Sequence, residues 1–363
     1  MKINGQAHTS VWTSAALNGK RTVHIIDQTA LPFEFRTMPI TSCAEAAEAI
    51  RTMRVRGAPL IGVTAAYGLA LAADIDPDTQ RLNVAAETLL KTRPTAVNLA
   101  WALAQMMHAI KALTPSARAA AAWAKADALA AEDVITNRAI GAHGLTLIRA
   151  LYEKHRRPIN ILTHCNAGWL ATVDWGTATA PIYMAHDAGI PVHVWVDETR
   201  PRNQGLLTAW EMRAHGVPHT YITDNAGGHF MQHGKVDLVI LGADRVSRAG
   251  DVCNKIGTYL KALAAFDNDV PFYVAVPSST IDWQLRNALN EIEIEERNHA
   301  EVRVLRGVSG NGAVSDFRLL DEKSAAANPA FDVTPARLVT GIITERGVAT
   351  PAGLASLFPE ASS

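Results

Sequence analysis

Six short runs rich in β-branched or aromatic residues recur between helix-like segments from about residue 143 onward. These runs are Ile159–Thr163, Val192–Val196, His219–Thr223, Asp237–Leu241, Phe272–Val276 and Leu338–Ile343. Regular alternation of short strands with helices is typical of a parallel sheet that is covered by helices on both faces. The sequence therefore predicts an α/β fold for this part of the chain.

The residues before this alternation are predicted to be mainly helical. Alanine and leucine runs at helical spacing predict helices over Cys43–Met53, Pro59–Ala73, Ala96–Leu113 and Ser116–Asp133. Two short strands are predicted at Thr22–Asp27 and Phe33–Arg36. We therefore expect a smaller, mainly helical N-terminal domain with short strands over residues 1–135, and a sheet domain over residues 136–363.

The charge balance argues against partners that are polyanions. Lysine and arginine total 34 against 35 aspartate and glutamate residues, and no block of like charge stands out. A nucleic-acid or anionic-membrane surface needs a cluster of basic residues. We therefore expect no nucleic acid and no membrane among the partners.

The cysteine pattern and the first residues indicate a cytoplasmic protein. Cys43, Cys165 and Cys253 lie far apart and show neither CxxC nor zinc-site spacing, so we expect no disulfide and no metal. The first fourteen residues lack the apolar core of an export signal, and no apolar run approaches the roughly 18 residues of a spanning helix.

Polar or glycine-bearing segments follow each predicted strand. They read HCNAG, DETRP, DNAGG, GADRV, PSST and TERG in chain order. All strands of a parallel sheet end at the same edge, where open α/β sheets bind their ligands. These six segments are therefore expected to converge on one crevice.

Cys165 and Asp244 are the two candidates for acid–base chemistry in this crevice. Cys165 could precede a helix whose free N–H groups favour a thiolate, although a cysteine at a strand end is often a small buried apolar residue. Asp244 follows an apolar strand, and such surroundings would raise its pKa toward neutrality. The alternative for Asp244 is a cap on the next helix.

Two arginine segments are candidates for binding an anion. Arg56, Gly57 and Ala58 precede a proline in a favoured first helical position, so backbone N–H groups and a guanidinium could seat a phosphate. Arg93 lies similarly before a helix. The alternative for both segments is an ordinary loop with a surface arginine.

Three further polar residues could contact the hydroxyls or the charge of a substrate. Lys255 supplies a point charge and Asn254 a hydrogen-bonding amide, although a solvated helix start explains both equally well. Gln204 is a neutral amide suited to sugar hydroxyls. His164 alternates to the other face of its strand and is interpreted as structural.

Several common motifs are absent from the sequence. It contains no GxxxxGK[ST] motif and no G-x-S-x-G elbow, and Gly310-Asn311-Gly312 does not resemble a dinucleotide fingerprint because it follows no clear strand. A P-loop nucleotide site and a serine-hydrolase triad are therefore not expected.

Nine stretches taken in order resemble one known family. They are VRGAPLIGV, RPTAVNL, THCNAG, VDETRPRNQG, ITDN, VILGADRV, GDVCNKIGTY, FYVAVPSSTID and NPAFDVTPARLVTGIITERG, between Val55 and Gly347. Together they resemble the methylthioribose-1-phosphate isomerases, relatives of ribose-1,5-bisphosphate isomerases and of regulatory subunits of a eukaryotic translation initiation exchange factor.

The resemblance implies a fold, a substrate and a set of site residues. It implies a helical N-terminal domain followed by a Rossmann-like domain, a homodimer, a sugar-phosphate substrate, and no metal or nucleotide cofactor. It also implies that Cys165 and Asp244 are catalytic. The positions that hold the phosphate and hydroxyls of the substrate would be Arg56, Gly57, Ala58, Arg93, Gln204, Asn254 and Lys255.

The chemistry of this family explains why it needs two proton-transfer groups. A phosphate on the anomeric oxygen locks the sugar ring, so the enzyme must open a glycosyl phosphate before the aldose becomes a ketose. The resemblance assigns ring opening and proton transfer between oxygens to Asp244, and the hydrogen movement between C1 and C2 to Cys165. A phosphoenolate route and a hydride shift both remain open.

The sequence departs from the common family pattern close to the expected pocket. Asp174-Trp175-Gly176-Thr177-Ala178 stands where many members read Gly-Tyr-Gly-Thr-Ala, and DNAGGHF lacks the usual methionine after asparagine. The departures concern the substituent at C5, and Trp175 suits an apolar methylthio group. Three alternatives remain: a ribose-1,5-bisphosphate isomerase, a 5-deoxyribose-1-phosphate isomerase and a noncatalytic sugar-phosphate-sensing subunit. The bisphosphate isomerase would need a second phosphate site, and no extra cationic motif is seen for one. The sensing subunit would need no proton-transfer pair.

Overall fold

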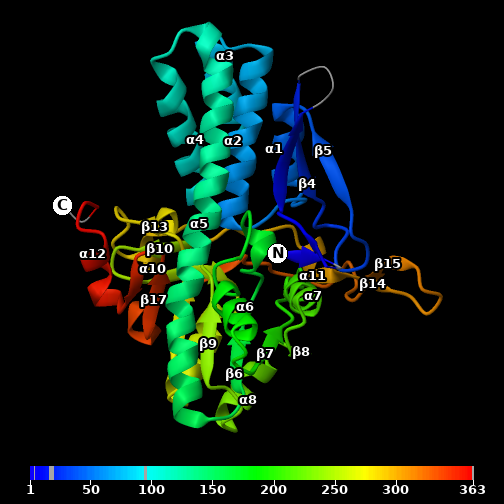
Figure 1. The fold of residues 1–363 in the computed structure, drawn as a ribbon. Helices are drawn as coiled ribbons and strands as arrows, with labels where there is room; N and C mark the ends of the chain where they lie inside the picture. Colours follow the sequence, from blue (N-terminus) through cyan, green and yellow to red (C-terminus); the bar gives the residue numbers. More distant parts are fainter. Residues whose placement is uncertain (4, 16–19, 94–95, 362–363) are drawn as a thin grey trace.

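A computed structural model describes residues 1–3, 5–15, 20–93 and 96–361 of the chain. Pro94 and Thr95 of the RPTAVNL stretch lie outside the described residues. Figure 1 shows a helical bundle above a second part that contains the large sheet, with one long helix running through both. The α/β architecture predicted from the sequence is confirmed.

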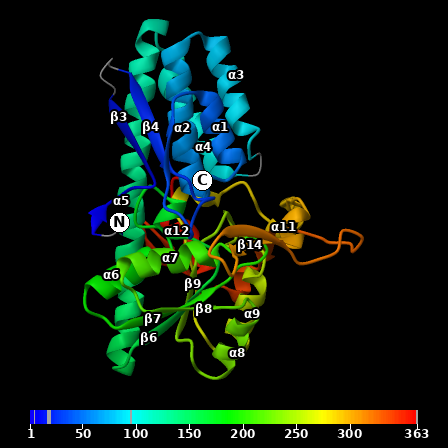
Figure 2. The same cartoon turned by 90° about the vertical axis from the view of Figure 1, so that its right-hand side faces the viewer.

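The upper part consists of helices beside a small antiparallel sheet (Figures 1 and 2). Its helices are α1 (Cys43–Arg51), α2 (Ala58–Ile75), α3 (Thr79–Leu90), α4 (Val97–Lys111) and the first half of α5 (Pro115–His155). The sheet contains β3 (Val11–Ala15), β4 (Arg21–Ile26) and β5 (Thr37–Ile40), and a short pair is formed by β1 (Lys2–Ile3) and β2 (Gln6–Ala7). One apolar core joins the three-stranded sheet to all five helices.

Two predictions for this part were wrong in their bounds. The predicted strand at Phe33–Arg36 is replaced by β5, because the Phe33 and Glu34 amides donate to the Ala30 carbonyl and close a turn. The helix predicted over Ser116–Asp133 continues to His155, where the chain turns through a left-handed Arg156. The division predicted at residue 135 remains a prediction, and residue 135 lies inside α5.

Helix α2 is a core helix with apolar residues on every side. By length and composition it is apolar enough to cross a membrane, but 78% of that window is buried inside the protein. Gly62 and Gly68 allow α4, α1 and α3 to approach it closely, because an added Cβ would lie 2.8 Å from the Asn98 carbonyl oxygen or from the Ala46 Cβ. Burial against these neighbours accounts for its apolar character.

The large sheet has seven strands in the order β18-β17-β12-β9-β6-β7-β8. Six of them are parallel: β6 (Ile159–Thr163), β7 (Val192–Asp197), β8 (His219–Ile222), β9 (Leu238–Leu241), β12 (Phe272–Ala275) and β17 (Gly341–Thr344). The edge strand β18 (Gly347–Ala349) is antiparallel to β17. Numbered along the chain, the parallel strands follow the doubly wound order 3-2-1-4-5-6 of a Rossmann-like sheet.

All six predicted strands of this sheet are confirmed, and the largest shift in bounds is at the last one. The last begins at Gly341 rather than Leu338, because Ala336–Leu338 form a short 3₁₀ helix. Neighbouring residues of β6 point to opposite faces, so Ile161 and Leu162 belong to two separate cores.

Helices cover both faces of the sheet. The core with Ile161 includes residues of α5, α6 (Ala180–Asp187) and α7 (Gly205–His215). The core with Leu162 includes residues of α8 (Ala226–Gln232), α9 (Thr258–Asp267) and α12 (Leu354–Leu357). The second half of α5 therefore belongs to the sheet domain, while its first half belongs to the bundle.

A second, four-stranded sheet was not predicted from the sequence. Its order is β13 (Ile281–Asp282), β10 (Arg245–Ser247), β11 (Val252–Lys255) and β16 (Phe331–Thr334). Between β13 and β16 lie α10 (Ala288–Glu291), α11 (Ala300–Arg303) and a hairpin of β14 (Val304–Val308) and β15 (Val314–Arg318), which projects from the body (Figures 1 and 2). This sheet carries Asn254 and Lys255 at the end of β11.

Strands β6 and β9 are neighbours at which the direction of the fold reverses. The chain proceeds from β6 outward to β7 and β8, and from β9 outward to β12 and β17. Crevices outside the carboxyl ends of two such strands are the usual ligand sites of open α/β sheets. Cys165 follows β6 and Asp244 follows β9, so both lie at this point.

Candidate active site

One cavity brings together all nine site residues that the sequence predicts. It lies at the carboxyl edge of the large sheet, beside the N-terminus of α2. Its lining includes Arg56, Gly57, Ala58, Arg93, Cys165, Gln204, Asp244, Asn254 and Lys255. These residues come from both parts of the molecule, so the cavity exists only when the bundle and the sheet domain are folded together.

The N-terminus of α2 forms one wall of the cavity. Gly57 has φ 91°, and an added Cβ would lie 2.4 Å from the Ala171 Cα, so only glycine fits. Pro59 occupies the first turn, where no N–H partner is needed, and no side chain caps the helix. The free N–H groups and the positive end of the helix dipole favour an anion here.

Arg56 stands beside this helix end in a fixed position. Its guanidinium donates to the Asn166 side-chain oxygen and, at 2.7 Å, to the Asn166 carbonyl oxygen. One terminal nitrogen lies 3.9 Å from the Cys165 sulfur. The buried Arg56 therefore links the anion-binding helix end to the cysteine.

Cys165 leaves β6 in a left-handed conformation with φ 67°. Its amide donates to the Thr199 hydroxyl at 2.8 Å. The helix expected directly after it is wrong, because the next helical residues are the 3₁₀ turn Trp169–Ala171. Burial raises the pKa of the Cys165 thiol, and the positive charges of Arg56 and Lys255 oppose this only in part.

Asp244 follows β9 and leads into β10, so the alternative that it caps a helix is wrong. Its amide donates to the Cys253 carbonyl at 3.0 Å. Burial raises the pKa of the Asp244 carboxyl, while the positive charges of Lys255, Arg93 and Arg56 lower it. The raised pKa suits the carboxyl to exchange a proton.

Asn254 and Lys255 are buried strand residues rather than a solvated helix start. The Lys255 ammonium donates to the Ala330 carbonyl at 2.8 Å and lies 4.7 Å from the centre of the Phe331 ring. The Asn254 amide donates to the Thr258 hydroxyl at 3.0 Å. Burial lowers the pKa of Lys255, and the negative charges of ionised Cys165 and Asp244 raise it.

Gln204 and Arg93 present buried polar atoms that have no partner. Among the described residues, neither the Gln204 side-chain oxygen nor the Arg93 Nε makes a hydrogen bond. A terminal Arg93 nitrogen lies 3.7 Å from the Glu295 carboxylate. Unpaired buried polar atoms are costly, so both atoms fit the contacts that a polar ligand would complete.

Comparison with known proteins identifies the family. Residues 54–351 match the initiation factor 2 subunit family. The chain is 61% identical to a methylthioribose-1-phosphate isomerase of Acidiphilium cryptum, over 99% of this chain and 98% of the relative. The chain belongs to the methylthioribose-1-phosphate isomerase family.

Solved structures of the family agree with the fold. A 5-methylthioribose 1-phosphate isomerase from Pyrococcus horikoshii superposes with a TM-score of 0.83 at 37% identity, covering 98% of this chain and 97% of that one. A protein described as the delta subunit of translation initiation factor eIF-2B from A. fulgidus superposes with a TM-score of 0.78 at 38% identity, covering 97% and 99%. The Rossmann-like fold and the helical N-terminal region that the resemblance to this family implied for the chain are confirmed.

Asn166, Arg202 and Arg297 are polar residues of the cavity that were not singled out from the sequence. Asn166 orients Arg56, and its position inside HCNAG was the available signal. Arg202 and Arg297 also line the cavity, and each donates to Glu301 at 2.8 Å. No motif marks Arg297, because it reaches the cavity from a segment of irregular structure near α11.

The prediction that Trp175 contacts the C5 substituent is not supported by its position. Trp175 does not line the cavity, and its neighbour Asp174 accepts from the N-terminal amine at 2.6 Å. The apolar lining instead includes Met53, Ile61 and Phe331.

Proposed function

We propose that the chain is an aldose–ketose isomerase that converts 5-methylthio-α-D-ribose 1-phosphate to 5-methylthio-D-ribulose 1-phosphate in methionine salvage. The observation that carries this proposal is the single cavity in which an acid–base pair, Cys165 and Asp244, faces an anion-binding helix end. The family membership supports the same reaction. We further propose that the enzyme acts in the cytoplasm as a homodimer.

The phosphate would bind at the N-terminus of α2. Backbone N–H groups beside Gly57 and Ala58 would donate to phosphate oxygens, and Arg56 would add a charged donor. Lys255 brings a second positive charge to the same cavity. Arg93, Gln204 and Asn254 would hold the sugar hydroxyls, because two of these side chains carry unpaired buried polar atoms.

The reaction requires a balanced set of transfers on the sugar. The bond from C1 to the ring oxygen breaks and the ring oxygen gains a proton. One hydrogen moves from C2 to C1, and the C2 hydroxyl loses its proton to become a carbonyl. Asp244 can serve both oxygen steps: as a neutral acid it protonates the ring oxygen, and as the resulting carboxylate it takes the proton of the C2 hydroxyl.

The protonation state of Cys165 bears on the route of the hydrogen. Burial raises the pKa of its thiol and no helix starts beside it to favour a thiolate, so the thiol suits proton donation better than removal of a C–H proton. We therefore favour a hydride shift, in which the thiol donates a hydrogen bond to the departing ring oxygen.

Deuterium at C2 of the substrate distinguishes the two routes. After turnover in ordinary water, retention of the label at C1 of the product supports the hydride shift. Loss of the label to water supports the phosphoenolate route, with Cys165 as the base.

The alternative substrates differ in what they need at C5. A second phosphate would need a positively charged side chain that is not already paired. Arg202 and Arg297 are both paired with Glu301, and Arg297 also pairs with Glu295 at 2.9 Å. The hydrogen bonds and charges of the two arginines lower the pKa of Glu301 to about 2. Met53, Ile61 and Phe331 offer an apolar surface instead. These contacts favour a methylthio substituent over a 5-phosphate.

Purified protein supplied with 5-methylthioribose 1-phosphate, 5-deoxyribose 1-phosphate or ribose 1,5-bisphosphate tests this choice by ketose formation. We expect the highest kcat/KM for the methylthio substrate. A higher value for the bisphosphate would overturn the substrate assignment, and binding without turnover of any of them would favour the sensing subunit. Light scattering of the same preparation tests the homodimer, which a monomer mass would contradict.

A further inference from the structure

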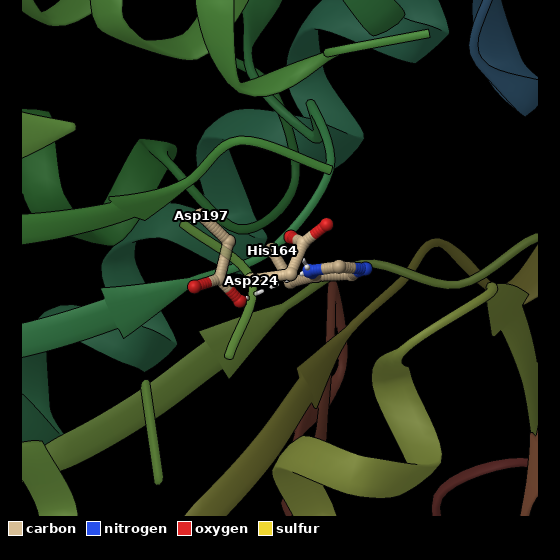
Figure 3. Close-up of side chains that lie close together, drawn as sticks. All are labelled: His164, Asp197 and Asp224. Carbon is tan, nitrogen blue, oxygen red and sulfur yellow. Dashed lines mark hydrogen bonds and ion pairs between the residues drawn. The ribbon is translucent and has the colours of Figure 1, made fainter. Parts of the chain in front are cut away.

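His164, directly before the catalytic cysteine, is buried in a cluster of charged side chains (Figure 3). Its Nδ1 lies 3.0 Å from an Asp197 carboxylate oxygen, and its Nε2 lies 2.9 Å from the Ile256 carbonyl oxygen. An oxygen of Asp224 lies 3.7 Å from the same Nδ1. Both ring nitrogens therefore face oxygen atoms.

These partners determine the protonation of the ring. A carbonyl oxygen only accepts hydrogen bonds, and the Asp197 oxygen that faces the ring also lies 3.2 Å from the Lys261 ammonium, which favours its ionised form. A neutral imidazole carries one N–H and one lone pair. Either neutral tautomer would therefore aim a lone pair at an acceptor, whereas an imidazolium donates to both.

The surrounding charges favour the same state. Four charged groups face the ring: Asp197 at the end of β7, Asp224 after β8, Asp332 in β16 and Lys261 in α9. Three carboxyl groups thus surround one ammonium, and a cationic ring reduces this imbalance. The same arrangement argues against a metal, because the ammonium already lies beside the Asp197 oxygen that would have to bind it.

This cluster connects the loops that form the floor of the active site. The Thr199 hydroxyl accepts from the Cys165 amide at 2.8 Å and donates to the Asp197 carbonyl at 3.1 Å, and the Thr199 amide donates to Asp224 at 2.8 Å. The carbonyl that accepts from His164 belongs to Ile256, next to Lys255. The ring thus connects the segment that carries Cys165 to the end of β11, which carries Lys255.

Two residues of this connection have an unfavourable backbone. Cys165 has φ 67° and Thr199 has φ 61°, and a left-handed conformation is rare for a β-branched residue. Such conformations persist when surrounding contacts hold them, and they cluster at functional sites. The hydrogen bonds around His164 supply those contacts.

We propose that His164 is a positioning residue, held as an imidazolium, that fixes the backbone of Cys165 relative to Lys255. The kinetic part of this proposal rests on the isomerase activity proposed above, whereas the charge state of the ring does not. His164 also lines the cavity, but among the described residues its ring makes no hydrogen bond or ion pair with Arg56 or with the first turn of α2. The phosphate of the substrate should therefore still bind when the ring is replaced.

The charge state is tested by NMR on full-length protein labelled with ¹⁵N-histidine, at pH 8. The signal that disappears in His164→Gln is assigned to His164 among the 13 histidines of the chain. If His164→Gln does not fold, the signal that shifts in Asp224→Asn gives the assignment. We expect both His164 nitrogens to carry protons. His193, whose pKa is lowered by burial and whose Nε2 faces the Thr220 hydroxyl at 2.9 Å, is the matched control and should carry one. A singly protonated His164 would overturn the proposal.

The positioning role is tested by the kinetics of His164→Gln. We expect kcat to fall by about 10-fold or more, because small misplacements of catalytic groups carry losses of that order, while KM changes less. His193→Gln should leave both unchanged. The positioning role would be overturned if kcat of His164→Gln were unaltered. It would also be overturned if kcat and substrate binding were weakened equally and a lower Tm of the variant explained both losses. An inactive wild type would refute the proposed function alone, since the NMR result would still stand.

Discussion

Glu211 provides a quantitative test of how burial changes the pKa of a carboxyl group in this protein. It is wholly buried in α7, where one oxygen accepts from the Leu170 amide at 2.7 Å and the other from the Tyr183 hydroxyl at 3.1 Å. Burial raises the pKa of Glu211 from 4.5 to about 7, although these hydrogen bonds oppose the shift. The carboxyl also reaches Gly168, where an added Cβ would lie 1.6 Å from it.

This raised pKa predicts how stability changes with pH. Below pH 4.5 the group is protonated in both the folded and the unfolded chain, so its contribution is fully present. Between pH 4.5 and about 7 the folded chain binds more protons than the unfolded chain, so the free energy of unfolding falls as pH rises. The difference between the two pKa values corresponds to a loss of roughly 3 kcal/mol.

Glu211→Gln removes this titration while keeping an oxygen for Leu170 and an amide beside Tyr183. Thermal unfolding of both proteins between pH 5 and pH 8 is the assay, followed by near-UV circular dichroism. We expect wild type to lose several degrees of Tm relative to the variant across this range. Glu48→Gln, on the exposed face of α1, controls for removing one negative charge. Parallel Tm curves for wild type and Glu211→Gln would show that the Glu211 carboxyl has no raised pKa in the folded chain.

Two further predictions concern the proposed phosphate seat. Gly57→Ala should raise KM by at least 10-fold, because the added Cβ would lie 2.4 Å from Ala171 and displace the start of α2. Gly189→Ala is its control, because Gly189 also has a positive φ but an added Cβ there meets nothing within 4 Å. Equal effects of the two substitutions on KM would contradict a phosphate site at this helix end. Lys255→Met keeps the packing on Phe331 but removes the charge, so KM should again rise by about 10-fold or more, on the scale of a charged hydrogen bond. Lys235→Met, which removes a cation 5.8 Å from Phe230, should leave KM unchanged, and an unchanged KM in Lys255→Met would argue against a substrate contact.

The parallel sheet was predictable because its strands are short, apolar and separated by helices. Nearly all residues of β6, β9 and β17 are buried, so these strands have apolar side chains on both faces, which is the pattern that such strands show in a sequence. Cys165 and Asp244 could be assigned to one edge of the sheet on the same grounds. Their position on either side of the reversal between β6 and β9 could not be predicted, because strand order depends on contacts distant in sequence.

The small sheet and the depth of the lysine were not predictable for a related reason. Strands β10 and β11 have only 3 and 4 residues. They pair with each other, but their other partners, β13 and β16, are distant in sequence, as Phe331 is from Lys255. Lys255 and Asn254 are polar, so local sequence favours an exposed position for them. Their burial depends on the Ala330 carbonyl and on Thr258, which only the folded chain brings near.

The environment of His164 shows the same limit. Alternation along the predicted strand places His164 on the face opposite Cys165, but the side chain is 1% exposed and lines the same cavity as Cys165. Its partners lie 33 residues away at Asp197 and 92 residues away at Ile256. No local pattern joins these positions, so a pairing role for the ring was not visible in the sequence.

We propose above that Cys165 and Asp244 perform the isomerisation in the cavity beside α2. The most direct measurement is kcat for 5-methylthioribose 1-phosphate with Cys165→Ser and Asp244→Asn, together with calorimetric binding of the substrate to each variant. Cys43→Ser, in α1 and outside the cavity, is the matched control. We expect kcat to fall by about 10²-fold or more in both variants while the substrate still binds. Turnover at the wild-type rate in either variant would contradict it.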